Sequence, residues 1–417
     1  MRMDPSDPSS EPTQKHKASP GLRRVLGTPL LVFYGLGVII GAGIYVLVGT
    51  VIAAAGEAAP WAFILAGALA ALTGLSYAEL AVRFPEAAGA AAYVKEAFGS
   101  DRLSQLTGLA VAAVVVVSSA SIARGSIGYV QVFLPWPGPL IAGLMVLLFT
   151  AIACLQVRES VGLAATMTVV EIGGLLMVVA AGWHVISASS PDWSSLVPRL
   201  DLAAGSGLVA GAFLAFFAFI GFENLANMAE EASVPERSLP RAIILSLGLS
   251  GLLYAAVTAV AILAISPEEL AASSAPLLLV AGHAPWFSPT LFTAIAIIAV
   301  ANGVLIEIVM LGRLLYGMAR RRWLPAWLGE VARRQHTPAR ATICGGVVIL
   351  VLTVALPFES LVAITSTITL LVFAIVNLAL WQLQRQAPRS TGFRVPRFVP
   401  PLASAANVGL VIAQLWA

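Results

Sequence analysis

The chain has 417 residues, of which 59% are hydrophobic and 11% are charged. Soluble domains carry roughly 25% charged residues, so this composition argues against a soluble protein and predicts an integral membrane protein with several spans. The formal net charge of +3 at pH 7 says little about partners, and we expect no nucleic acid among them.

The first 24 residues are predicted to form a disordered cytosolic tail, because Met1 to Ser19 are polar and rich in Pro, Ser and Lys. We do not expect a signal peptide here. The apolar segment that follows is too long for the core of a signal peptide and lacks a small-residue cleavage site.

The first apolar run extends without a charge from Val25 to Gly56, which is long enough to cross a bilayer. Its centre contains Gly41 and Gly43, and glycine costs about 1 kcal/mol in a helix relative to alanine. Non-helical backbone at membrane depth is tolerated only where it lines a cavity or is buried in protein. We therefore predict a broken helix facing a polar site at the midplane, which is typical of secondary transporters.

Eleven uncharged or nearly uncharged runs predict membrane helices, so the expected fold is all-α. They are residues 29–55, 60–82, 104–133, 139–156, 160–186, 207–230, 242–265, 289–315, 341–357, 360–383 and 398–416. With the N-terminus in the cytoplasm, all but two of the 24 Lys and Arg residues fall on the cytoplasmic side. The two others are Arg124 and Arg199. An odd number of spans means either that the C-terminus lies outside or that a twelfth helix has been lost.

The sixth run, like the first, has a glycine near its middle: Gly221, followed by the carboxylate of Glu223. Two interrupted helices five spans apart indicate an inverted five-plus-five repeat. We place the repeats at about 26–186 and 207–384, within a transporter domain that covers residues 25–417 and ends in an extra helix at about 398–416.

Such a pair of breaks has a definite chemical preference. An unwound turn exposes N–H groups with partial positive charge, which suit a carboxylate, and C=O groups, which suit an ammonium. A site with both ends matches a zwitterion. The pattern therefore favours amino acids over sugars or inorganic ions as the substrate.

Several sequence stretches carry a resemblance to a known family. They are Gly35–Ile44, Tyr77–Pro85, Tyr93–Gly99, Phe219–Glu223, Ala229–Ile243, Arg313–Arg320, Trp323–Pro325 and Thr337–Ala341. In these stretches the chain resembles the amino acid–polyamine–organocation (APC) superfamily of permeases, which has the LeuT-like fold. The resemblance runs from about Leu26 to the C-terminus.

The resemblance implies the main contacts of a substrate with the two breaks. Its carboxylate would meet backbone N–H groups of the first break. Its ammonium would meet carbonyl groups of both breaks, and an aromatic ring would close the site. The N–H groups belong to Gly41, Ala42 and Gly43, the carbonyls lie near Ile39, Phe217 and Ile220, and the aromatic ring is Phe217. Among the other aromatic residues of the sixth run, we also expect Phe222 to belong to the site.

Carboxylates inside membrane helices cost roughly 2.5–3.5 kcal/mol and are functional candidates for that reason. Glu307, near the middle of the eighth span, is expected to be a counter-ion for a cationic substrate or a proton carrier. The alternatives are a structural partner for Arg124 and a protonated, hydrogen-bonded core carboxyl. Glu171 and Glu223 are expected to act in coupling or gating, against the alternative of local hydrogen bonds. Glu79 is expected to pair with Arg83, four residues further on.

Two departures from the superfamily bear on the coupling ion. Some proton-coupled members carry a lysine in the fifth helix, where this chain has Glu171, so coupling through that lysine is not available. Sodium-coupled relatives place hydroxyl groups near the position of Leu311 and Gly312, and none is present here. We therefore expect protons rather than sodium.

Together these observations predict a secondary active amino acid transporter of the inner (plasma) membrane that works by alternating access. Proton symport is expected, with amino acid or amine exchange as the alternative, and Glu307 favours cationic amino acids or polyamine-like amines. A non-transporting sensor on the same scaffold is the other open alternative. We expect no catalytic residue, cofactor or metal ion, and the partners are the substrate, protons and membrane lipid; the sequence leaves the oligomeric state open.

Overall fold

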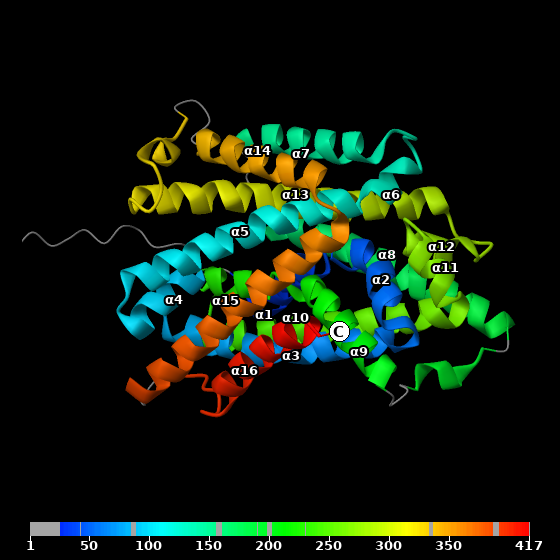
Figure 1. Cartoon of the computed structure of the whole chain (residues 1–417), viewed down its shortest axis with the longest axis horizontal. Coiled ribbons are helices and arrows are strands. Elements are labelled where there is room, and N and C mark those ends of the chain that lie inside the picture. Colours follow the sequence, from blue (N-terminus) through cyan, green and yellow to red (C-terminus); the bar gives the residue numbers. More distant parts are fainter. Residues whose placement is uncertain are drawn as a thin grey trace, which may run out of the picture.

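The computed structural model describes residues 26–41, 43–84, 89–155, 161–189, 191–197, 202–229, 231–332, 337–386 and 392–416. The tail predicted at residues 1–24 lies outside these ranges. Within them the chain forms helices and no strand (Figure 1).

The first half of the chain holds the elements up to the start of the sixth predicted span. They are α1 (Thr28–Ile40), α2 (Gly43–Ala55), η1 (Gly56–Ala58), α3 (Ala59–Arg83), α4 (Gly89–Phe98), α5 (Asp101–Gly125), α6 (Ile127–Gln131), α7 (Gly138–Cys154), α8 (Val161–Ala188), η2 (Trp193–Leu196) and α9 (Leu202–Ala215).

The second half begins with two 3-10 helices and continues with longer α-helices. The elements are η3 (Phe216–Phe219), η4 (Phe222–Met228), α10 (Pro235–Ala264), α11 (Pro267–Ala272), α12 (Pro276–Gly282), α13 (Pro289–Arg320), α14 (Ala339–Ala355), α15 (Phe358–Gln386) and α16 (Val399–Gln414).

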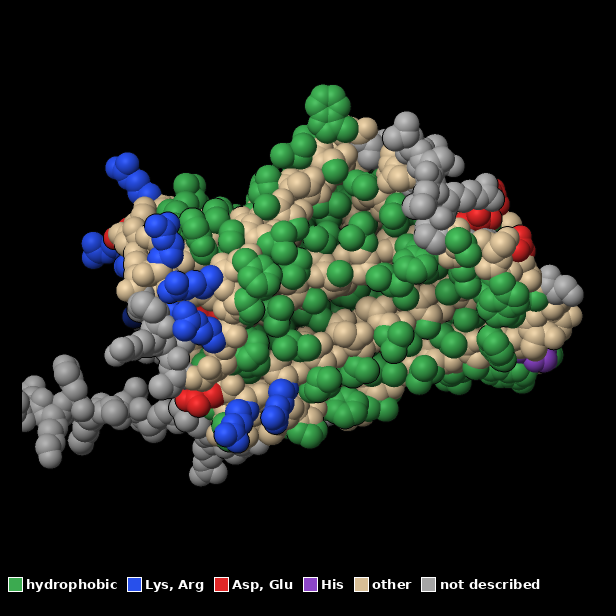
Figure 2. Space-filling view, turned by 90° about the horizontal axis from the view of Figure 1, so that it is seen from below, with side chains coloured by type: hydrophobic (Ala, Val, Ile, Leu, Met, Phe, Trp, Pro, Cys, Tyr) green, Lys and Arg blue, Asp and Glu red, His purple; other side chains and the backbone are tan. Residues whose placement is uncertain are grey.

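The predicted class, an all-α membrane protein, is confirmed. Among the described residues, seven helical segments are long and apolar enough to cross a membrane, and four shorter apolar helices of 10–17 residues accompany them. Figure 2 shows hydrophobic side chains over most of the visible face, with Lys and Arg gathered at one end. The number of eleven spans stays a prediction, because length and composition do not decide whether each short helix crosses the membrane.

The helices pack in an arrangement that leaves the two breaks near the centre. Figure 1 shows α7, α13 and α14 together along one side of the molecule and α3, α10 and α16 along the other. α5 and α15 cross obliquely between these groups. α1 packs against α8 and α10, while α2 packs against α9, so the interrupted segments are surrounded by continuous helices.

The predicted interruption of the first span is confirmed. α1 ends at Ile40 and α2 begins at Gly43; Ala42, between them, lies outside the described residues. A Cβ atom placed on Gly43 would lie 2.9 Å from the Cα atom of Ala218 in η3. Glycine at this position therefore lets the second half of the first span touch the backbone of the other broken span.

The second interruption is also confirmed, at Ile220 and Gly221. Ile220 is extended, and Gly221 has a φ of 119°, a left-handed conformation in which glycine carries no steric penalty. A Cβ on Gly221 would lie 2.7 Å from the Cγ1 atom of Val38. The glycine thus permits both the turn of the chain and the close approach of α1.

Candidate functional site

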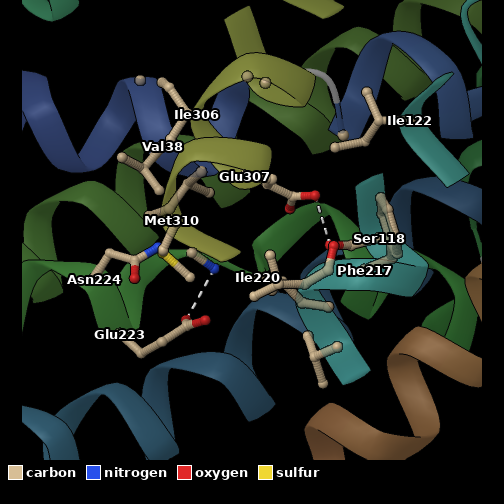
Figure 3. A pocket seen from close by; sticks show the side chains of 18 of the residues that line it. Val38, Ser118, Ile122, Phe217, Ile220, Glu223, Asn224, Ile306, Glu307 and Met310 are labelled. Carbon is tan, nitrogen blue, oxygen red and sulfur yellow. Dashed lines mark hydrogen bonds between the residues drawn. The ribbon is translucent and has the colours of Figure 1, made fainter. Parts of the chain in front are cut away.

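A cavity of about 80 Å³ lies between the two breaks, α5 and α13 (Figure 3). A buried water needs about 10–15 Å³ of such space, so there is room for roughly five to eight water-sized groups. That is about the number of heavy atoms in a small amino acid. The polar side chains in the lining are Ser118, Glu223, Asn224, Asn302 and Glu307.

The cavity meets the end of α1, whose last carbonyl groups have no partner within the helix. Ile39 lines the cavity, and its carbonyl oxygen accepts a hydrogen bond of 2.8 Å from the hydroxyl of Tyr254 on α10. The same hydroxyl lies 3.1 Å from the carbonyl oxygen of Ala218 in η3. One side chain therefore joins carbonyl groups from both interrupted spans.

The expected N–H groups of the first break differ in their availability. The N–H of Gly41 donates to the carbonyl oxygen of Gly37 at 3.1 Å, so in this structure it is already satisfied. Gly43 lines the cavity as the first residue of α2, where helical N–H groups have no partner within the helix. The positive end of the α2 dipole therefore faces the cavity.

The second break contributes Phe217, Ile220 and Glu223 to the lining. The sequence predicted substrate contacts for the first two and a role in coupling or gating for Glu223. The Phe217 carbonyl accepts from the N–H of Ile220 at 3.2 Å. The Glu223 carboxylate accepts from the N–H of Gly221 at 2.9 Å (Figure 3). Its carboxylate thus stabilises the backbone that the break leaves unpaired.

Phe222 is placed outside the cavity, contrary to the expectation that it forms part of the substrate site. Its fully buried ring packs against Tyr77 and Phe373, with ring centroids 5.8 and 5.1 Å away. The left-handed turn at Gly221 precedes it directly. Because neighbouring side chains on a tight helix point in different directions, Glu223 faces the cavity and Phe222 faces the aromatic cluster.

Glu307 of α13 lies in the cavity wall opposite Glu223 (Figure 3). Its Oε2 atom accepts hydrogen bonds from Ser118 at 2.7 Å and from Ser119 at 2.8 Å, both on α5. Arg124 instead donates to the carbonyl oxygen of Thr353 at 2.9 Å. Glu307 is therefore paired with two hydroxyl groups rather than with Arg124.

Glu171 of α8 lies one layer behind the cavity. It is fully buried, and its Oε1 atom is 3.5 Å from the Nδ2 atom of Asn302, which lines the cavity. Its Oε2 atom has no hydrogen-bond partner among the residues that the structure describes. The hydroxyl of Tyr45 donates to the backbone carbonyl of Glu171 at 2.6 Å, which fixes α8 against α2.

Sequence reasoning missed Ser118, Asn224, Asn302 and Tyr254 as residues of the site. The signal that could have found the first three is a small polar side chain within an otherwise apolar span, because such groups need a partner or a cavity in the membrane. Within the described residues, no cluster of three His, Cys, Asp or Glu side chains could hold a metal ion.

A comparison with protein families matches residues 26–416 to a model described as an amino acid permease. The cationic amino acid transporter 3, mitochondrial, of Arabidopsis thaliana is 30% identical over 404 residues; the aligned part covers 91% of this chain but only 65% of that protein. An uncharacterized transporter of Mycobacterium tuberculosis is 32% identical over 382 residues, covering 89% of this chain and 82% of the relative.

The methylthioribose transporter of Bacillus subtilis is 29% identical over 419 residues, covering 93% of this chain and 87% of the relative. These relatives are named as transporters, which agrees with the broken helices and the central cavity described above. Because the family model covers nearly the whole sequence, the chain belongs to the amino acid permease family of the APC superfamily and is an all-α, multi-pass membrane protein.

Proposed function

We propose that this permease is a secondary active amino acid transporter of the inner (plasma) membrane, with its N-terminus in the cytoplasm, that binds its substrate in the central cavity and works by alternating access. The observation that carries the proposal is that both interrupted spans border the same cavity. Family membership supports amino acids as the substrate class.

The polarity of the cavity supports a zwitterionic substrate. The α2 end at Gly43 offers partial positive charge to a carboxylate, while the carbonyl groups near Ile39 and the carboxylate of Glu223 suit an ammonium. Gly41 contributes an N–H only if its bond to Gly37 opens. The carboxylate of the substrate is therefore assigned first to the start of α2.

A cationic substrate is supported by the charges in the wall. The titratable side chains among the lining residues are the two carboxyls Glu223 and Glu307, with no Lys, Arg or His beside them. Carboxylates in a desolvated site need a compensating positive charge or a proton. Four relatives are named cationic amino acid transporters, whereas another is named a methylthioribose transporter. The wall chemistry therefore carries this part of the proposal together with those names.

Protons are proposed as the coupling ion, in symport with the substrate. Glu171 is fully buried behind Asn302, and Glu223 is a partly buried carboxyl in the cavity wall. An isolated charge in such surroundings is unfavourable, so each is suited to take up and release a proton. Exchange without net proton movement is the competing mode.

The test is uptake by the purified protein in liposomes with a panel of neutral and cationic amino acids, at two internal pH values and with or without sodium. We expect uptake that an inward proton gradient accelerates and that sodium does not change. Uptake driven only by amino acid preloaded inside the liposome would replace symport by exchange. Absence of uptake and of binding for every amino acid would contradict the proposed function itself.

A further inference from the structure

Two adjacent serines on α5 contact the carboxyl of Glu307. Each serine hydroxyl lies near two acceptors, the carboxyl and a backbone carbonyl, but has only one proton to donate. The Oγ atom of Ser118 lies 2.7 Å from Glu307 Oε2 and 3.3 Å from the carbonyl oxygen of Val115. The Oγ atom of Ser119 lies 2.8 Å from the same Oε2 and 2.7 Å from the same carbonyl. Both serines are almost completely buried.

A hydroxyl group has one proton to donate, so each serine can serve only one of its two acceptors at a time. If Glu307 is ionised, both hydroxyls donate to Oε2, and two charge-assisted bonds stabilise the carboxylate. If Glu307 is protonated, its O–H donates to a serine oxygen and the serines donate to the Val115 carbonyl. Both states keep every proton bonded without moving a heavy atom.

We propose that Ser118 and Ser119 are specificity-determining positioning residues that let Glu307 hold either a proton or the cationic end of a substrate side chain. This inference rests on the proposed amino acid transport and deepens it. Ionised Glu307 accepts a cationic side chain, and protonated Glu307 accepts a neutral side chain of the same shape. When a cationic substrate enters the protonated site, the proton leaves Oε2 for water and the ammonium takes its place.

Among the described residues around Glu307, no cationic side chain pairs with its carboxyl, so the cationic end of a substrate is the partner that fits. Of the titratable groups near its level, Glu223 faces it across the cavity, Glu171 reaches the wall through Asn302, and Arg124 is bonded to a backbone carbonyl.

The other titratable groups on α13 and on the elements packed against it do not line the cavity. They are Asp101, Arg102, Tyr129, Cys154, His184, Arg313, Tyr316, Arg320, Arg340 and Cys344. Two like charges at Glu223 and Glu307 repel each other, which favours a proton on one of them until a cation arrives.

The experiment measures binding of L-ornithine and L-norleucine to the full chain in lipid nanodiscs by calorimetry. The two ligands have the same shape, but ornithine ends in an ammonium and norleucine in a methyl group. Titrations in two buffers of different ionisation enthalpy give the number of protons released. We expect ornithine binding to release protons and to weaken as the pH falls, and norleucine binding to release none and to persist at low pH.

Three variants separate the serine role from general stability. Ser118→Ala with Ser119→Ala removes two donors from the carboxylate and only one acceptor from the acid form, so ornithine affinity at neutral pH falls about tenfold or more while norleucine affinity is retained. Ser118→Thr, with Ser119 unchanged, keeps both hydroxyls and is expected to retain most of the ornithine affinity that the double variant loses. Ser121→Ala is the matched control, because that buried hydroxyl only donates to Val117 at 2.8 Å.

An ornithine pH profile and proton release that are unchanged in the double variant would overturn the inference, as would an equal loss for both ligands. If the unaltered protein binds both amino acids without proton release, only this inference fails. If it binds neither these nor any other amino acid, the proposed transport function fails as well.

Discussion

The hydroxyl of Tyr254 donates a hydrogen bond of 2.8 Å to the carbonyl oxygen of Ile39, next to the last residue of α1. Its second contact, 3.1 Å to the carbonyl of Ala218, lies on the other interrupted span. Together with the direct contacts of Gly43 with Ala218 and of Gly221 with Val38, this hydroxyl on α10 joins the two breaks that border the cavity.

We expect Tyr254→Phe to lower the free energy of unfolding by about 1–3 kcal/mol, because it leaves buried carbonyl groups without their donor. We also expect it to reduce uptake by protein that is still folded. Thr258→Val is the control, since that hydroxyl only donates to the Tyr254 carbonyl one turn earlier at 2.7 Å. Thermal unfolding and liposome uptake measure the two effects. Normal uptake in Tyr254→Phe would show that the hydroxyl does not set the cavity.

Gly221→Ala tests the second break. A side chain at a φ of 119° is strained by about 1–3 kcal/mol, and its Cβ would also collide with Val38. We predict loss of substrate binding in a protein that still reaches the membrane. Gly248→Ala in α10, where a Cβ meets nothing within 4 Å, is expected to leave binding unchanged; equal binding by both variants would argue against a required turn at Gly221.

Glu307→Gln keeps the size of the side chain and removes its charge. Uptake of ornithine is expected to fall at least about tenfold, because a buried ammonium then loses its charged partner, whereas norleucine uptake is retained. Competition assays with both amino acids at neutral pH measure the difference. An equal loss for the two substrates would exclude the role of counter-ion.

Glu79 is predicted to be a stabilising residue. It is fully buried and accepts hydrogen bonds from Arg83, at 2.9 and 2.5 Å, from Gln384 at 2.8 Å and from the Val395 N–H at 2.7 Å. The expected pair with Arg83 is thus present, and it also fastens α15 and the approach to α16.

Removing one member of a buried charge pair costs about 3–5 kcal/mol, so Glu79→Gln is expected to lower the unfolding temperature of the purified protein clearly. The exposed Glu96 on α4 offers the control, since surface substitutions usually stay within about 0.5 kcal/mol. If Glu96→Gln and Glu79→Gln melt alike, the cluster does not contribute to stability.

Leu26, just before α1, is paired through its backbone with Ala232, between η4 and α10. If alternating access moves α1 away from α10, we predict that these two segments must separate. The Leu26 N–H donates to the backbone carbonyl oxygen of Glu231 at 3.0 Å. The Ser233 N–H donates to the carbonyl oxygen of Leu26 at 2.9 Å. The test is Leu26→Cys with Ala232→Cys in a protein whose Cys154 and Cys344 are changed to alanine. Residues paired across a bridge lie side by side, which a disulfide requires.

We expect oxidation of this double-cysteine variant to stop uptake and a reductant to restore it, while each single cysteine remains active. Liposome uptake before and after reduction gives the result. Full activity of the cross-linked protein, verified by mass spectrometry, would mean that this pairing persists through the whole transport cycle.

Much of the fold followed from local properties of the sequence. Long apolar runs indicate helices, because backbone exposed to lipid without hydrogen bonds is costly. Glycines such as Gly43 and Gly221 within these runs indicate where the helices are interrupted. Glu223 and Glu307 were found for a related reason: a carboxyl in a membrane span is too costly to be there without a partner.

The contacts between side chains were not accessible in this way. Ser118 and Glu307 are separated by 189 positions in the chain, and the sequence offered Arg124 as the possible structural partner instead. Phe222 was expected to line the substrate site, yet its ring lies in an aromatic cluster. The contact of Glu171 with Asn302 was likewise not predicted.

The sequence by itself therefore determined the membrane class, the places of the two breaks and the chemistry of a few costly residues, because each depends on the free energy of one segment in lipid. Only the tertiary structure decided which side chains face the cavity. In a membrane, apolar side chains gain little by turning inward rather than toward lipid, so the rotation of each helix about its axis is set by close packing against its neighbours.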